Sequence, residues 1–244
     1  MDLSIAKLRE DKLLHGRQKG FPWFCRKDIL MIGAGGINSW AAFLLGRIGH
    51  TLYVYDDDIV EPHNIGGQLY LVNQIEQPKV QALKSLIMDS SDAEVYPIQE
   101  RYVEDSIVSP ITILGLDNMT TRKIAVEKWA SQKDGREILI DGRLEGEQGI
   151  IYTLRSNEDV EQWMNEYFPD DENEIRVNCT TQQTSYNAAI MGGYIVTVFN
   201  NHIANKAMEK DIRGVPFKIE YMLPIITVDW TEVSNLKTEI HHGS

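Results

Sequence analysis

A glycine-rich turn placed between a strand and a helix constrains the fold of this chain more than any other feature of its sequence. The turn, GAGGINS at residues 33–39, follows the apolar run DILMI at 28–32 and opens a segment that ends at Gly49. A short apolar run bounded by glycine is typical of a buried parallel strand, and a glycine after a helical pattern commonly ends the helix. The β-branched and aromatic run TLYVY follows at 51–55. Strand, turn, helix and strand therefore form a βαβ unit.

The alternation of strands and helices continues in looser form. The sequence predicts helices over 37–47, 78–88 and 121–131, and further strands over 94–98, 111–116 and 137–140. Strands that alternate with helices indicate an α/β fold with a mainly parallel sheet. The expected fold is a Rossmann-like sheet with flanking helices.

The second half of the chain changes character. The sequence predicts a strand over 149–154, a surface loop or short helix over 157–174, a largely helical stretch over 180–209 and a late strand pair over 217–222 and 224–230. No linker separates two domains, so we expect one continuous domain over 1–244. Its nucleotide-binding part would be 1–148. A C-terminal extension at 149–244 would hold a crossover loop, a helix, the strand pair and a surface for a partner.

The net charge narrows the classes of partner. Lys and Arg number 24 against 36 Asp and Glu, which gives a formal charge of −12, whereas nucleic acids and anionic membranes attract basic surfaces. The most apolar run, 188–199, is too short for a membrane span, and the charged N-terminus lacks the apolar core of a signal peptide. We therefore expect a cytoplasmic protein that binds neither nucleic acid nor membrane.

The glycine turn is also the first candidate site. Glycines let the backbone approach phosphates closely, and a helix N-terminus offers unpaired N–H groups and a favourable dipole. Asp56, at the end of the second predicted strand and about 20 residues on, is placed to bind ribose hydroxyls. The alternative is a merely structural turn. Taken alone, the arrangement is the dinucleotide fingerprint and favours NAD.

Two further segments change the choice of nucleotide. YDDDIVEPHNIGGQLYLVNQIEQPKVQAL begins at residue 55, and LGLDNMTTRK begins at residue 114. Together with GAGGINS and the N-terminal arm, and in this order, they resemble the ThiF/MoeB/HesA superfamily. These are the ATP-dependent activating enzymes of ubiquitin and ubiquitin-like proteins and their bacterial relatives. The resemblance covers most of the chain and implies an adenylyltransferase that uses ATP and Mg²⁺.

The resemblance assigns roles residue by residue. The nucleotide-binding positions that it implies are Gly33, Gly35, Gly36, Asp56, Asp58, Asn64, Gln68, Lys79, Asp117 and Asn118. Among them, Lys79 would neutralise the phosphates, and Asp117 matches the magnesium-associated aspartate. Arg122 matches the arginine that usually follows this aspartate. Arg9 matches an N-terminal arginine that reaches into the partner's active site in dimers, with Arg17 as a nearby competitor.

These residue types suit the implied reaction. A carboxylate attacks the α-phosphate of ATP and gives an acyl adenylate and pyrophosphate, and this nucleophile is already ionised at neutral pH. Catalysis must hold two anions together and stabilise the charge on the departing pyrophosphate. Backbone N–H groups, a lysine, an arginine and a magnesium ion held by a carboxylate do this. Considered singly, these residues also have structural explanations. Lys79 could be an ordinary solvated surface lysine, and Asn118 could be a helix cap.

Two positions depart from the family pattern. Asn38 replaces the last glycine of the usual GxGGxGS, which is tolerable if the backbone there is helical. Gly67 replaces the arginine of the usual N-x-x-R-Q. Either another arginine substitutes (Arg9, Arg17 or one from a partner), or the chain belongs to a divergent or an inactive branch.

The chain has two cysteines, too few for a disulfide framework or a four-cysteine zinc site. Cys179 lies just before the long helical stretch, where the resemblance implies a cysteine that takes the acyl group from the adenylate as a thioester. A helix N-terminus favours the thiolate nucleophile. The alternative is an ordinary buried side chain. Cys25, in the aromatic run FPWFC, is interpreted as structural.

The implied substrate is the C-terminal carboxylate of a ubiquitin-like or sulfur-carrier protein, and the implied enzyme is a homodimer. The segment 157–174, with eight acidic residues and no Lys or Arg, and the late strand pair are candidate docking surfaces. A peptide or a tRNA-linked carboxylate stays open as the substrate.

Two other functions also stay open. An NAD-dependent oxidoreductase would give Lys79 and Asp117 no role, and Gly67 favours a non-catalytic subunit of a heterodimeric activating enzyme.

Overall fold

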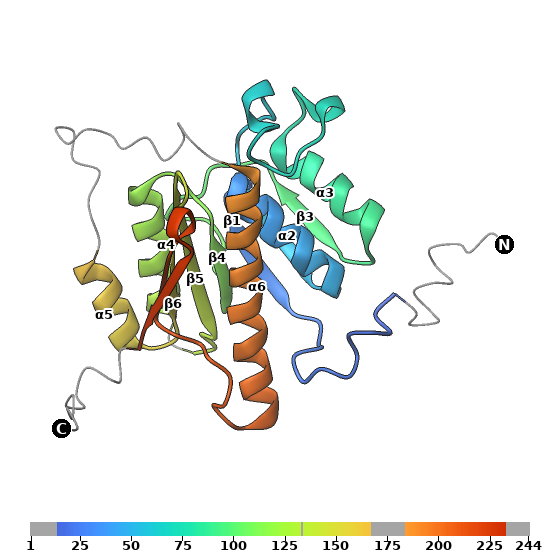
Figure 1. Ribbon diagram of the computed structural model, residues 1–244. Coiled ribbons are helices and arrows are strands. Elements are labelled where there is room, and N and C mark those ends of the chain that lie inside the picture. The colour runs from blue at the N-terminus through green and yellow to red at the C-terminus, as the bar shows by residue number, and fades with distance from the viewer. Residues whose placement is uncertain (1–13, 133, 167–183, 233–244) are drawn as a thin grey trace, which may run out of the picture.

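One eight-stranded sheet forms the centre of the molecule (Figure 1). The computed structural model describes residues 14–132, 134–166 and 184–232. The strands are β1 Asp28–Ile32, β2 Thr51–Tyr55, β3 Val95–Ile98, β4 Ile111–Leu114, β5 Ile138–Glu145, β6 Gln148–Leu154, β7 Lys218–Met222 and β8 Thr227–Thr231. Their order in the sheet is β3-β2-β1-β4-β5-β6-β7-β8. The strands from β3 to β5 in this order are parallel, and β6, β7 and β8 are added antiparallel.

Helices cover both faces of this sheet (Figure 1). Helices α2 Gly36–Ile48, α3 Lys79–Ser90 and α6 Ser185–Met208 pack on one face, and α4 Met119–Ser131 and α5 Asn157–Asn165 pack on the other. Strand β1 shows the consequence, because Ile29 and Met31 join the core under α2 while Leu30 and Ile32 join the core under α4. A strand covered on both faces needs apolar residues on both. Within the described ranges, no helix is long and apolar enough to cross a membrane.

The expected α/β fold is confirmed, with shifts at the ends of some elements. Strands β1 and β2 occupy the predicted residues. Helix α4 begins at Met119 rather than Thr121, because the Asn118 side chain caps it by accepting the Thr121 N–H at 2.8 Å. Strand β5 continues to Glu145 rather than ending at Ile140, because it forms a hairpin with β6.

Three other segments add detail to the prediction. The N-terminal arm consists of turns in its described part, from residue 14 on. The acidic stretch 157–174 begins with α5, which is capped where Ser156 Oγ accepts the Asp159 N–H at 3.1 Å. Its residues after 166 lie outside the described ranges. The late strand pair is confirmed as β7 and β8, which are joined through a 3₁₀ turn at Leu223–Ile225.

Gly192, the first of two adjacent glycines in α6, meets α2 at close range. A Cβ atom on Gly192 would lie 2.9 Å from the backbone nitrogen of Ala41 and 3.0 Å from Cβ of Trp40. The two backbones are too close there for a side chain, and packed backbone does not yield easily. A Cβ atom on Gly193 would meet nothing within 4 Å. Packing therefore requires glycine at the first position and not at the second.

These two glycines provide a matched test of the α2–α6 contact. We expect Gly192→Ala to lower the free energy of unfolding by about 1–3 kcal/mol, because overpacking outweighs the gain in helix propensity. Gly193→Ala should leave it unchanged or raise it by up to about 1 kcal/mol. Urea denaturation of both variants measures the difference. Equal effects would show that close approach at Gly192 does not limit the packing.

A buried histidine lies at the amino-terminal edge of the sheet, between α2 and β2. Nδ1 of His50 accepts the Lys27 backbone N–H at 3.2 Å, and the ring packs edge-on against Phe199 with centroids 5.3 Å apart. Burial, followed by the positive charges of Arg26 and Lys27, lowers the pKa of His50 from 6.5 to about 4. The folded protein therefore keeps this ring neutral at pH values where the unfolded chain protonates it.

This shift makes the stability depend on pH. Because the folded pKa of His50 lies below the unfolded value, its contribution is fully present above pH 6.5 and is lost as the pH falls toward 4. We expect this ring to remove about 2 kcal/mol of unfolding free energy between pH 7 and pH 5. Urea denaturation at both pH values should show a smaller difference for His50→Asn, which keeps an acceptor for the Lys27 N–H but does not titrate. His63→Asn, at an exposed position, should keep the wild-type difference, and the same pH dependence in both variants would contradict the assignment to His50.

Candidate nucleotide-binding site

The strand order creates a topological switch point at one edge of the sheet, where a ligand-binding crevice is expected. Strand β1 pairs with β2 on one side and β4 on the other, and β1 leads into α2 on one face whereas β4 leads into α4 on the opposite face. In open parallel sheets, ligands bind at the carboxyl ends of the strands at such a switch point. The loops after β1, β2 and β4 carry the predicted phosphate loop, Asp56 and Asp117. The fold therefore brings these predicted site residues to one edge.

Gly33 makes the tight turn between β1 and α2. Its φ of +89° lies in the left-handed region that favours glycine, and its N–H donates to the Tyr55 carbonyl at 2.8 Å. A Cβ atom on Gly33 would lie 2.6 Å from the carbonyl oxygen of Gly115. The loops after β1 and β4 therefore touch through their backbones, which only glycine permits here.

Asn38, which replaces a glycine of the family pattern, is part of the structure that builds this loop. It lies in the first turn of α2 and is fully buried, so the helical backbone that makes asparagine tolerable is present. Its Nδ2 donates to the carbonyls of Ile32 and Gly33 at 3.0 and 2.9 Å. A Cβ atom on Gly115 would lie 2.5 Å from its Cγ. The Asn38 side chain therefore fills the space over Gly115 and ties the end of β1 to α2.

The N-terminus of α2 is open toward the crevice. Its N-cap residue, Gly35, provides no side-chain cap, and the first turn of the helix contains no acidic residue. Gly35 is partly exposed, whereas Gly33 and Gly36 are buried. Uncapped N–H groups and the positive end of the helix dipole attract an anion. This geometry fits the phosphate-binding role predicted for Gly35 and Gly36.

Asp56 is held in place by the backbone on both of its carboxylate oxygens. Oδ2 accepts the Ala34 N–H at 2.6 Å, and Oδ1 accepts the Asp58 N–H at 2.9 Å. Burial raises the pKa of Asp56, and the Lys79 charge and these two hydrogen bonds oppose that rise. Asp56 therefore connects the end of β2 to the phosphate loop. Its predicted contact with ribose stays a prediction.

Lys79 is a buried cation at the start of α3. Its Nζ lies 2.7 Å from Oδ2 of Asp58, and its backbone N–H donates to the Asp58 carbonyl at 2.9 Å. Lys79 is only 7% exposed, whereas the Asp58 side chain is 66% exposed. The explanation of Lys79 as a solvated surface lysine is therefore wrong. Its buried ammonium is paired with a hydrated carboxylate and lies close enough to Asp56 to influence its pKa.

Residues 61–70 fold against the start of α2. Asn64 is buried, its Oδ1 accepts the Glu61 N–H at 2.8 Å, and its carbonyl accepts the Gln68 N–H at 2.8 Å. The Leu69 N–H donates to Ser39 Oγ at 3.1 Å, which docks the segment on α2. Asn64 thus shapes a turn through its side chain. The phosphate contacts predicted for Asn64 and Gln68 stay predictions.

The loop after β4 presents Asp117 and is anchored from inside. Asp117 is exposed, and Asn118 caps α4 with its side chain, which is the structural role considered for it. Arg122 is buried, forms an ion pair with Asp141 and donates to the Leu116 carbonyl. Arg122 therefore supports the loop that carries Asp117. A magnesium ion at Asp117 would take its other ligands from nucleotide phosphates and water, as Mg²⁺ commonly does.

The remaining predicted residues have different outcomes. Arg9 and Cys179 lie outside the described residues, so their roles stay predictions. Arg17 belongs to a turn held at the amino-terminal edge of the sheet, where His15 bonds Asp92 at 2.8 Å. This edge is opposite to the crevice, so Arg17 does not replace the missing arginine within its own chain. Cys25 is exposed at the same edge, just before β1, and its interpretation as structural stays a prediction.

Sequence reasoning missed one residue of the crevice, Tyr70. Its hydroxyl donates to the carbonyl of Ala34, inside the phosphate loop, at 2.6 Å. In the sequence Tyr70 is an aromatic residue in the run LYLV, which carries no sign of such a contact. The only available signal is its position just after the N-x-x-R-Q-like segment.

An open helix start and an acid after the second strand, both at the switch point, are typical of Rossmann-like nucleotide-binding proteins. The ThiF family model matches residues 24–227. The chain belongs to the ThiF family, which confirms the resemblance of its motifs. A search of curated protein sequences finds no match.

Solved structures confirm the fold. A crystal structure of PaaA is similar with a TM-score of 0.64 at 18% identity, over 95% of this chain and 75% of that one. Escherichia coli MccB with ATP gives a TM-score of 0.60 at 14% identity, over 91% of this chain and 66% of that one. The microcin C7 biosynthetic enzyme MccB in complex with N-formylated MccA gives 0.64 at 14%, over 91% and 67%. The chain thus spans 66–75% of the length of these proteins.

Proposed function

We propose that this protein is an ATP-dependent adenylyltransferase that activates a carboxylate as an acyl adenylate. The observation that carries the proposal is the buried Lys79 ammonium, which lies near Asp56 at the switch point, in a member of the ThiF family. A dinucleotide-dependent oxidoreductase would use the open helix start and Asp56 but has no use for this cation. An enzyme that handles a triphosphate needs it to balance negative charge.

The proposed reaction is a displacement at phosphorus. A carboxylate oxygen of the substrate attacks the α-phosphorus of ATP, the bond from this phosphorus to the bridging oxygen breaks, and pyrophosphate leaves with the electron pair. No proton moves, because the carboxylate is already ionised. The N–H groups at the start of α2 and the Lys79 ammonium would stabilise the phosphate charge, while Asp56 would hold the ribose. Mg²⁺ held by Asp117 would supply further positive charge to the leaving pyrophosphate.

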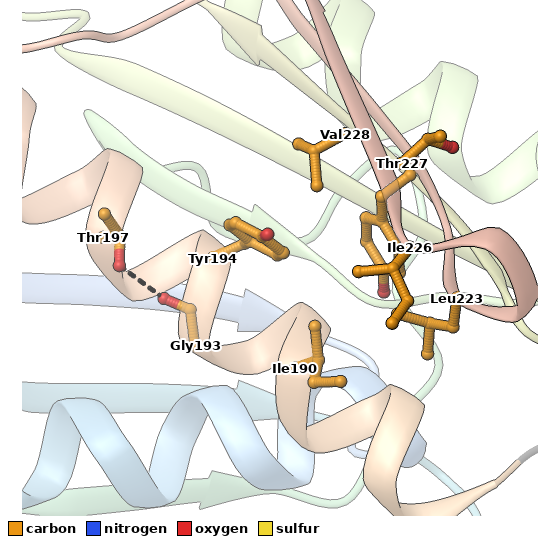
Figure 2. Close-up of a pocket in the computed structure, with 9 residues that line it drawn as sticks. Ile190, Gly193, Tyr194, Thr197, Leu223, Ile226, Thr227 and Val228 are labelled. Carbon is orange, nitrogen blue, oxygen red and sulfur yellow. Dashed lines mark hydrogen bonds between the residues drawn. The ribbon is translucent and has the colours of Figure 1, made fainter.

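A groove between α6 and the β7–β8 hairpin is the proposed docking site for the substrate. Its volume is about 460 Å³, and its lining residues are Ile190, Gly193, Tyr194, Thr197, Tyr221, Leu223, Ile226, Thr227 and Val228. Figure 2 shows the side chains of α6 facing those of the turn and β8 across this space. No lining residue is charged, and the volume is in the range of ligand sites. The groove therefore suits an uncharged, apolar segment.

The position of this groove favours a polypeptide as its occupant. Met222, at the end of β7, pairs with Gln148, and Gln148 pairs with Glu145 at the carboxyl end of β5, so the groove lies at the same edge of the sheet as the crevice. All residues of β8 are exposed, and Ile226 and Trp230 are 86% and 70% exposed. An extended segment can pair with such an edge strand while its apolar side chains enter the groove. We propose that the C-terminal segment of the substrate polypeptide binds there and directs its carboxylate toward the crevice.

Finer features of the function rest on the family resemblance. A ubiquitin-like or sulfur-carrier protein as the polypeptide, a homodimer, a thioester on Cys179 and a cytoplasmic location stay predictions. Crystal structures of E. coli MccB with ATP and of MccB with N-formylated MccA support a search among peptides as well as among carrier proteins.

Ligand-dependent thermal unfolding tests the proposed function. Mg-ATP at about 100 times its Kd adds roughly 2.7 kcal/mol of stability, which should raise the melting temperature by roughly 5–10 °C for a chain of this size. NAD at the same concentration should give no rise. A rise with NAD and not with Mg-ATP would overturn the proposal in favour of an oxidoreductase. If neither ligand has an effect, the non-catalytic subunit that Gly67 favours becomes the better explanation.

A further inference from the structure

Both polar backbone groups of Ala34, inside the phosphate loop, are held by side chains from other segments. The Ala34 N–H donates to Oδ2 of Asp56 at 2.6 Å, and its carbonyl accepts the Tyr70 hydroxyl at 2.6 Å. Tyr70 is only 4% exposed. Its burial and the nearby carboxylates of Asp56 and Asp58 raise its pKa well above 10. The Tyr70 hydroxyl therefore stays protonated at neutral pH and acts as a donor.

The preceding residue, Gly33, is fixed in the same way. Its N–H donates to the Tyr55 carbonyl at 2.8 Å, and its carbonyl accepts Nδ2 of Asn38 at 2.9 Å. The next N–H along the chain is that of Gly35, the partly exposed N-cap residue of α2. The backbone groups of Gly33 and Ala34 are therefore held by hydrogen bonds, and the Gly35 N–H, which can bind an anion, follows them directly in the chain.

The Gly35 N–H and the Ala34 carbonyl belong to one planar peptide. In a trans peptide these two groups point in opposite directions, and the chain contains no cis peptide bond in its described part. Because the Ala34 carbonyl points toward the buried Tyr70, the Gly35 N–H points away from it. Rotation of this peptide plane would turn that N–H inward, and glycine at position 35 does little to prevent rotation because it has no Cβ. The Tyr70 hydroxyl opposes the rotation, since it would lose its acceptor while buried.

We propose that Tyr70 is a positioning residue that sets the direction of the Gly35 N–H for binding a phosphate of the nucleotide. The inference rests on the proposed function and adds a residue to which the family resemblance gives no role. Tyr70 does not touch the nucleotide in this proposal. It acts through the peptide that joins Ala34 to Gly35.

Tyr70→Phe removes the hydroxyl and keeps the ring. We expect the Kd of Mg-ATP, measured by isothermal titration calorimetry on the full chain, to rise about 5- to 10-fold, as for the loss of one well-placed hydrogen bond. The Kd of adenosine should stay within about twofold of the wild type, because adenosine has no phosphate to meet the Gly35 N–H. A role in stability alone would weaken both ligands equally.

Tyr102→Phe is the matched control. Tyr102 is also 4% exposed, and its hydroxyl donates to the Ile107 carbonyl at 3.0 Å, in the segment between β3 and β4. Both variants should lose a similar amount of thermal stability, but only Tyr70→Phe should bind Mg-ATP more weakly. An unchanged Kd for Mg-ATP in Tyr70→Phe, or an equal loss for both ligands, overturns the proposal. If the wild-type protein binds adenosine as tightly as Mg-ATP, the triphosphate adds no affinity, and this result overturns the proposed function instead.

Discussion

Arg122→Met should lower the free energy of unfolding by about 3–5 kcal/mol, because it breaks a buried ion pair and leaves a carboxylate that water does not reach. Arg122 is paired with Asp141, a completely buried residue of β5 whose side chain faces α4 and α5. The carboxylate would keep Nε of Arg143 at 2.9 Å and Nε1 of Trp163 at 3.0 Å. These remaining partners place the expected loss toward the lower end of the range. Urea denaturation at neutral pH measures it.

The shape of the guanidinium group suggests a second variant. Arg122 donates to Asp141, to the Gly142 carbonyl at 3.1 Å and to the Leu116 carbonyl. An ammonium group does not reproduce this planar set of donors, so Arg122→Lys should also destabilise the protein. Lys123→Met, at the next position of α4, where the side chain is 44% exposed, is the control and should change the stability by less than about 1 kcal/mol. A loss as small as this for Arg122→Met would show that the buried pair is not a major source of stability.

The same contact connects stability to the candidate site. The Leu116 carbonyl that Arg122 holds directly precedes Asp117. In a variant of Arg122 that still folds, the loop should therefore hold the carboxylate of Asp117, the predicted magnesium ligand, less firmly in position. The sequence motif LGLDNMTTRK shows the order of these residues. It does not show that the arginine points into the protein.

The first βαβ unit is predictable from sequence because all its signals are local. The apolar run of β1, the glycine turn and Gly49 as the helix end lie within about twenty residues, and no distant residue changes their meaning. The end of β5 was harder to predict, since the residues from Asp141 to Glu145 become a strand through pairing with β6. Tertiary pairing decides the structure of such a segment more than its own propensity.

Side-chain partners were the least predictable part of the site. The family resemblance implies that Lys79 and Asp58 are both nucleotide-binding positions, and nothing in the sequence shows that the fold pairs them across 21 positions. Asn38 counts as a departure from the family pattern, and only the structure shows that its amide holds the end of β1. Motifs identify residue types that suit a chemistry. The directions of side chains depend on loops that pack against each other, such as those after β1 and β4.

Lys79→Met should weaken the binding of Mg-ATP by about 100-fold, the effect of removing one placed charge from a phosphate site. The ammonium is buried and faces an exposed carboxylate, so a bound triphosphate can attract it from a partner that water already solvates. Methionine keeps the apolar stem of the side chain, which preserves packing at the start of α3. Isothermal titration calorimetry with Mg-ATP and with adenosine separates the contribution of the phosphates to the affinity from that of the nucleoside. Only the affinity for Mg-ATP should fall.

The exposure of Asp58 separates this prediction from a general loss of stability. When Lys79 is removed, the Asp58 carboxylate stays hydrated, so the free energy of unfolding should change by less than about 1 kcal/mol. Lys84→Met, further along the same helix, is the matched control and should bind Mg-ATP like the wild type. If Lys79→Met retains the wild-type affinity for Mg-ATP, the buried ammonium only supports the loop through Asp58, and the role that carries the proposed function is lost. If both lysine variants weaken binding equally, the effect comes from the net charge of the chain and not from a built site.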